Sequence, residues 1–215
     1  MPDDAIQPST ARASEGSDSA QRGDEILSLA RAAFVEKGFD GASMQDLARA
    51  AGMSAGNFYR YFPSKAAIVE ALVARDLAEV EESFLAIAAS PDPLSALKSA
   101  LRFEMGRHCE GRDDLLWAEI AAAATRKPEV AATLARMEEG ITHRVAQVMG
   151  LAAGLPEAEA LERFGIHSRL IFLIMHGAMT AQMARTQPRD GELIELVLST
   201  IDRVMDDAIA DLKDR

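Results

Sequence analysis

The residues best suited to bind a polyanion lie between Ser54 and Lys65. Tyr59 and Tyr61 are the only tyrosines of the 215-residue chain, and Arg60 stands between them. On a helix, residues two apart point in different directions, so each phenol can bond to a different phosphate or base edge. A guanidinium between two such hydroxyls is the group that most often binds guanine specifically.

Small residues precede the tyrosines. Ala55, Gly56 and Asn57 would let the backbone approach bases closely. Lys65 follows at the start of the next predicted helix, where free backbone N–H groups also favour an anion. No acidic residue occurs between Ala48 and Val69. The chemistry that this segment supports is therefore contact with nucleic acid.

Two short helices are predicted to position these side chains. Ser43 and Asp46 have the spacing of a capping box, and Gly52 comes where a left-handed residue closes a helix cheaply. Between them, apolar residues recur at helical spacing at Met44, Leu47, Ala48 and Ala51. Ser54 is a natural cap for the second helix, which Pro63 should end near Tyr61 or Phe62.

The second helix has an apolar face as well as a polar one. Phe58 and Phe62 are four residues apart, so they share a face that we assign to the core. An earlier helix, predicted from Asp24 to about Gly38, supports both short helices through a stripe of Ile26, Leu29, Ala30, Ala33 and Phe34. Two short helices joined at a glycine also occur in bundles that bind no DNA.

The run S-M-Q-D-L-A-x-x-A-G-M-S-x-G-N-F-Y-R-Y-F-x-S-K, from Ser43 to Lys65, closely resembles the DNA-binding domain of the tetracycline-repressor (TetR) family of bacterial transcriptional regulators. An A-x-x-x-F-x-x-x-G-F segment from Ala30 to Phe39 precedes it. The resemblance covers roughly residues 24–70. The rest of the chain matches only in length and helical character.

The resemblance implies a role for each residue of the motif. Residues expected to bind phosphates are Ser43, Ser54, Tyr59, Tyr61 and Lys65. Residues expected to face or approach base edges are Ala55, Gly56, Asn57 and Arg60. Phosphate contacts would set the register on DNA, and base contacts would specify the sequence.

Composition and patterning predict an all-α protein, because alternation of strand type is absent. We expect a disordered tail over residues 1–23, a three-helix helix-turn-helix DNA-binding domain over residues 24–68, and a larger helical ligand-sensing and dimerisation domain over residues 69–215. The N-terminus lacks the cationic start and apolar core of a signal peptide. The single cysteine, Cys109, fits a reducing compartment, so a cytoplasmic location is expected.

The net charge of −11 is unevenly distributed. Residues 22–68 carry six basic and five acidic residues, whereas residues 69–215 carry 16 basic and 25 acidic ones. The chain is thus acidic except around the proposed phosphate contacts. This pattern favours a regulator that relies on dimerisation and specific contacts over one with a general basic surface.

The C-terminal part contains the helices expected to form a dimer. A long helix from Ser64 to about Ala89 would connect the two domains, and Ser90-Pro91-Asp92-Pro93 stops it. Helices predicted from Pro156 to about Thr186 and from Gly191 to about Asp211 are apolar around most of their circumference. Paired with a second copy, they would bury both faces in a four-helix bundle, although a monomeric core would also explain them.

The same part is rich in methionine, which suits an adaptable apolar pocket. Core packing without a ligand would look the same, and the resemblance favours a pocket for a small apolar or amphipathic effector. The residues expected to line it are Phe103, Met105, Trp117, Ile120, Met137, Ile141, Phe172, Met175, His176 and Met179.

Neither a metal site nor an active site is predicted. Glu104, His108 and Cys109 lie close in sequence, but no second group at ligand spacing accompanies them. No nucleophile elbow, phosphate-binding glycine loop or other catalytic motif occurs, so no cofactor and no catalytic residue is assigned.

Together the residues and the resemblance predict a homodimeric repressor that leaves a palindromic operator when an effector binds. An activator on the same scaffold is the alternative, and an all-helical enzyme or a dimerisation module is a more distant one.

Overall fold

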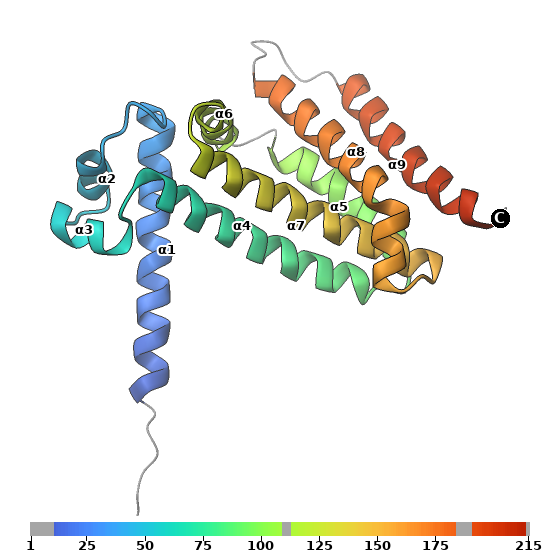
Figure 1. Cartoon of the computed structure of the whole chain (residues 1–215), viewed down its shortest axis with the longest axis horizontal. Coiled ribbons are helices and arrows are strands. Elements are labelled where there is room, and N and C mark those ends of the chain that lie inside the picture. Colours follow the sequence, from blue (N-terminus) through green and yellow to red (C-terminus); the bar gives the residue numbers. More distant parts are fainter. Residues whose placement is uncertain (1–10, 109–112, 184–190, 214–215) are drawn as a thin grey trace, which may run out of the picture. The chain divides into compact units, whose positions relative to one another are not determined.

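The computed structural model describes residues 11–108, 113–183 and 191–213, and within these ranges all regular structure is helical. The all-α prediction is confirmed. Figure 1 shows the helices in chain order: α1 (Ala11–Lys37), α2 (Met44–Ala50), α3 (Ala55–Tyr61), α4 (Lys65–Ala88), α5 (Pro93–His108), α6 (Asp113–Ala124), α7 (Pro128–Ala153), α8 (Glu157–Met183) and α9 (Gly191–Lys213).

Helix α1 begins earlier than the sequence indicates. It is helical from Ala11, although a disordered tail was expected over residues 1–23, of which residues 1–10 lie outside the described residues. The physical reason is propagation: once the packed part of a helix has formed, each further residue adds a hydrogen bond without a new nucleus. The packed part itself differs in one position from the predicted stripe, because Leu27 is buried and Leu29 is 45% exposed.

The helices form two compact units, and the boundary between Ile68 and Val69 falls inside α4. In the first unit, α2 packs on α1 and α3 packs on α2 (Figure 1). Phe34 and Phe39 stack with ring centroids 5.4 Å apart, and Leu47 and Phe58 are fully buried with them. This small core holds the two short helices in place.

The second unit is built around the pair α7 and α8, with α9 packed on α8 (Figure 1). Helix α7 ends at Gly154, whose φ of 72° lies in the left-handed region that glycine adopts at no steric cost. Gly150 allows α7 and α8 to approach closely, because a Cβ at this position would lie 2.2 Å from the Cβ of Ala160.

One face of α8 and α9 belongs to this core, and the other face is open. Phe164, Ile171 and Met175 of α8 are buried. Ile166 on the opposite face is 77% exposed. The large apolar side chains of this open face, here called the α8–α9 face, are Ile166, Leu170, Leu173, Leu193 and Leu196. No helix in the described ranges is both long and apolar enough to cross a bilayer.

Candidate nucleic-acid interface

The start of α2 is fixed by a capping box. The Ser43 hydroxyl accepts the backbone N–H of Asp46 at 3.1 Å, and the Asp46 carboxylate accepts the backbone N–H of Ser43 at the same distance. The ammonium of Lys37, at the end of α1, donates to Asp46 at 2.7 Å. This bond and those from Ser43 hold the pKa of the Asp46 carboxyl well below its usual range. The carboxylate thus ties α1 to α2.

The turn between α2 and α3 depends on Gly52, whose φ is 64°. Its N–H bonds to the carbonyl of Arg49, and the N–H of Met53 bonds to that of Ala48. Ser54 then caps α3, its hydroxyl accepting the N–H of Asn57 at 3.3 Å. Both caps expected from the sequence are confirmed, and they set the point at which α3 begins.

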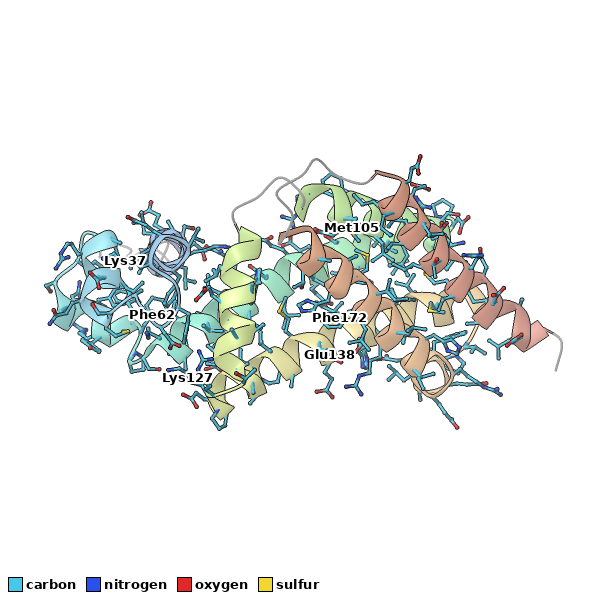
Figure 2. The ribbon with its side chains drawn as sticks, turned by 90° about the horizontal axis from the view of Figure 1, so that it is seen from above. Lys37, Phe62, Met105, Lys127, Glu138 and Phe172 are labelled. Carbon is cyan, nitrogen blue, oxygen red and sulfur yellow. The ribbon has the colours of Figure 1, made fainter. Side chains whose placement is uncertain are left out.

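Two phenylalanines hold α3 from one side. Phe58 is completely buried, Phe62 is 8% exposed, and their ring centroids are 5.6 Å apart. The shared core face expected for this pair is confirmed; Phe62 can be followed in Figure 2. With this face buried, the remaining circumference of α3 points to solvent.

The solvent side of α3 presents most of the residues singled out in the sequence. Tyr59 and Tyr61 are 47% and 46% exposed. Arg60 is exposed and forms no hydrogen bond or ion pair with any described residue. We call this surface the α3 face; its residues are Ser54, Ala55, Gly56, Asn57, Tyr59, Arg60 and Tyr61, all exposed except Ala55, which is half-buried.

Gly56 is informative because the protein itself does not require it. A Cβ added there would meet no atom within 4 Å. A glycine inside a helix costs roughly 0.5–1 kcal/mol relative to alanine. At Gly56 the backbone of α3 is therefore not covered by a side chain, which leaves room for a partner to approach it closely.

The side chain of Lys65 is bonded within the first unit. Its ammonium donates to three carbonyl oxygens of the loop after α1, those of Phe39 at 2.6 Å, Asp40 at 3.1 Å and Ala42 at 3.0 Å. It also lies 5.0 Å from the centroid of the Phe39 ring. An ammonium has three N–H groups, and all three are used here. Lys65 therefore ties the loop to the start of α4, a geometry that favours an indirect role over the predicted phosphate contact.

The hydroxyl of Ser43 is likewise bonded within the first unit. Its hydroxyl donates to Asp46 Oδ2 at 2.5 Å while it accepts the Asp46 N–H. The proton that a phosphate would accept is already bonded to a carboxylate, which would itself repel a phosphate. Ser43 acts in the capping box. The pairing of Ser43 with Asp46 follows from the capping-box spacing, whereas the contact of Lys37 with Asp46 does not, since Lys37 comes from another helix.

The ten residues predicted to line an effector pocket differ in burial. Met105, Ile120 and Met175 are buried in the second unit, and Trp117, Met137, Ile141, Phe172 and Met179 are half-buried. Phe103 is 70% exposed, and His176 is exposed with its ring stacked on Phe172 at 5.8 Å. Met105 on α5 and Phe172 on α8 are labelled in Figure 2. These residues line neither the surface hollow at Ala158–Arg163 nor the cavity between α4 and α7.

Of the three grouped residues considered for a metal, Cys109 lies outside the described residues, and Glu104 is bonded to Arg107 at 2.9 Å. Within the described ranges, no group of three or more histidine, cysteine or acidic side chains could hold a metal ion.

Comparison with known proteins supports the assignment of this surface. Residues 26–72 match the family model described as bacterial regulatory proteins, tetR family. This span contains α2, α3 and the whole α3 face. It also agrees with the extent of the resemblance seen in the sequence.

Relatives extend the similarity beyond the motif. The chain is 29% identical to the HTH-type transcriptional regulator UidR of Escherichia coli K12 over 174 residues, which cover 79% of this chain and 86% of UidR. It is 39% identical over 51 residues to the HTH-type transcriptional repressor KstR2 of Mycolicibacterium smegmatis, covering 24% of this chain and 25% of that one. The fold is similar to that of GusR from Salmonella enterica, with a TM-score of 0.66, 22% identity, and coverage of 88% of this chain and 96% of GusR.

Proposed function

Because the chain belongs to the TetR family of DNA-binding transcriptional regulators, we propose that it represses transcription as a homodimer and leaves its operator when an effector binds. The observation that carries the DNA-binding part is the α3 face. It combines an exposed guanidinium, two exposed phenols and a glycine in open space on one short helix. A place in the cytoplasm, beside the chromosome, follows from this role.

In this proposal α3 lies in a major groove. Arg60 binds a guanine through two hydrogen bonds, a contact that discriminates against other bases by about 1–3 kcal/mol. Asn57 and the small residues Ala55 and Gly56 face base edges. Tyr59, Tyr61 and the Ser54 hydroxyl bind phosphates and set the register. Lys65 and Ser43 act indirectly, by holding the helices that carry these groups.

The α8–α9 face supports dimerisation. Ile166, Leu170 and Leu173 form an exposed stripe at helical spacing on α8, and Leu193 and Leu196 are exposed on α9. Large apolar groups in contiguous exposed patches mark interaction surfaces. Two copies of such a face, related by two-fold symmetry, would bury one another, and the operator would then be palindromic.

Repression is supported by KstR2, a protein named as a repressor that shares 39% identity over 51 residues with this chain. An effector response requires that a ligand bind one state of the dimer better than the other. The difference between the ligand's binding free energies for the two states limits how far it can shift their populations. A switch of the populations from 1:99 to 99:1 needs a difference of about 5.5 kcal/mol.

Selection of bound sequences from a random pool of double-stranded DNA tests this function. The expected result is enrichment of one palindromic sequence, bound with a stoichiometry of two chains per duplex. Enrichment of no sequence above the starting pool would contradict the proposal. A single half-site bound by one chain would contradict its dimeric part.

A further inference from the structure

A cavity of about 210 Å³ lies between the C-terminal end of α4 and the second half of α7, wholly inside the second unit. Phe84, Leu85 and Ala88 of α4 line one side of it, and Val148 and Leu151 of α7 line the other. Leu85 is 62% exposed and Leu151 is 53% exposed, so large apolar side chains stand open to solvent at this cavity.

One charged pair in the lining is already neutralised. The guanidinium of Arg144 on α7 lies 2.5 Å from the carboxylate of Glu81 on α4. It also donates to Gln147 Oε1 at 2.8 Å. A negatively charged ligand would have to displace Glu81 to reach this guanidinium, and would still meet the remaining carboxylates.

The other carboxylate of the lining belongs to Glu157, on which Arg144 acts only at longer range. Glu157 accepts a hydrogen bond from Gln147 Nε2 at 2.5 Å and lies 3.1 Å from His143 Nε2. Within the described residues no lysine or arginine forms an ion pair with it. The hydrogen bond with His143, followed by that with Gln147, lowers the pKa of the Glu157 carboxyl, so this group is negatively charged near neutral pH. Its side chain is 63% exposed.

We propose that this cavity binds a small amphipathic organic cation. The ammonium group pairs with Glu157 at the mouth, and the apolar part lies against Phe84, Val148 and Leu155. Counting the lining carboxylates of Glu81 and Glu157 against the guanidinium of Arg144 leaves one negative charge, which favours a cation over an anion of the same size. A wholly apolar ligand would leave that charge unused.

The inference deepens the proposed effector response, on which its regulatory meaning rests. Four lining residues belong to α4, the helix that begins with Lys65 in the first unit. A cation bound beside Glu81 and Phe84 would favour one position of this end of α4 over another. Binding itself, however, can be measured without DNA.

The test is calorimetric titration of the full-length protein with octyltrimethylammonium, octanoate and octanol, which share one alkyl chain. The expected result is that octyltrimethylammonium binds roughly fivefold tighter than octanol, and octanoate binds weakest, as a single partly exposed charge pair predicts.

Three variants locate the site. Glu157→Gln should weaken octyltrimethylammonium roughly fivefold and leave octanol unchanged, whereas Glu139→Gln, at an exposed position of α7 outside the cavity, should change neither. Leu151→Ser should weaken all three probes. Equal affinities for the three probes, or ammonium binding that Glu157→Gln leaves unchanged, would overturn the inference. If the ammonium binds as expected but operator affinity does not change, the site stands and the proposed effector response fails.

Discussion

The side chains of the α3 face owe their exposure to neighbours that point inward. Phe58 and Phe62 bury one side of a seven-residue helix, so Tyr59, Arg60 and Tyr61 must face outward. The caps at Ser54 and at Ser43 determine where each helix begins, and thereby which residues share a face. A change of register by two residues would put Arg60 where Phe58 or Phe62 now lies.

Substitution of Gly56 is expected to change the stability of the protein and its affinity for DNA in opposite directions. Gly56→Ala should raise the free energy of unfolding by roughly 0.5–1 kcal/mol, because alanine loses less conformational entropy in a helix and meets no atom in the free protein. Operator affinity should fall roughly tenfold, the equivalent of one good base contact. Urea unfolding and equilibrium DNA binding measure the two effects. A variant that is more stable and binds DNA equally well would show that no partner approaches this position.

Asp46 makes the first unit sensitive to acid. Since the folded-state pKa lies below the unfolded value of about 3.9, the unfolded chain binds more protons between these two values. The free energy of unfolding should therefore fall as the pH drops below about 4. Unfolding of Asp46→Asn at a series of pH values provides the comparison. The variant should be less stable than the wild type at neutral pH, and the difference should shrink in acid; a difference independent of pH would contradict the account.

At the scale of elements, Lys65 joins the loop after α1 to the start of α4. Lys65→Met keeps the length of the side chain but leaves three carbonyl oxygens without a donor, and should cost about 2–4 kcal/mol of stability. Lys37→Met, which removes an exposed ion pair with Asp46, should cost at most about 1 kcal/mol.

The salt dependence of DNA binding distinguishes this role from a phosphate contact. Loss of one phosphate contact flattens the plot of log K against log salt concentration by about 0.9. Measured at a temperature at which Lys65→Met is fully folded, the slope should equal that of the wild type. A flatter slope would instead indicate a direct contact between Lys65 and a phosphate.

The elements of the motif were predictable because their signals are local. Ser43, Gly52, Ser54 and Pro63 each act on residues within four positions, and the structure places α2 and α3 between them. The target of Lys65 was not predictable in the same way, since Phe39 lies 26 residues earlier and the bond depends on the assembled core. Leu29 shows a smaller limit: helical spacing permits either Leu27 or Leu29 in the stripe, and packing buries Leu27.

The same limit applies to sites in the second unit. The pairing of Arg144 with Glu81 joins residues far apart in the sequence, and no local pattern predicts it. Composition instead pointed to the methionine-rich segments elsewhere in the unit. The apolar pattern of a helix also does not show which side of the helix packs against the rest of its own chain. Ile171 and Ile166 are both isoleucines on α8, yet Ile171 is buried and Ile166 is 77% exposed.

At the scale of the whole molecule, the proposed dimer depends on the α8–α9 face. Ile166→Glu should barely affect the fold of one chain, because the side chain is 77% exposed. In a dimer it would bury an unpaired carboxylate and raise the dissociation constant roughly 100-fold, about 3 kcal/mol. Sedimentation equilibrium measures this constant. Phe103→Glu, at a 70% exposed position on α5, is the control and should leave the dimer intact; equal behaviour of both variants would argue against the α8–α9 face.

Binding of Arg60→Ala to the selected operator tests the central claim most directly. Affinity for the operator should fall by about 1–3 kcal/mol, and the guanine that Arg60 binds should become replaceable without further loss. Affinity for unrelated DNA should change little, and Arg163→Ala, which removes the same charge from an exposed position on α8, should bind the operator as the wild type does. If Arg60→Ala bound the operator and unrelated DNA with the same affinities as Arg163→Ala, the α3 face would not be the surface that recognises the sequence.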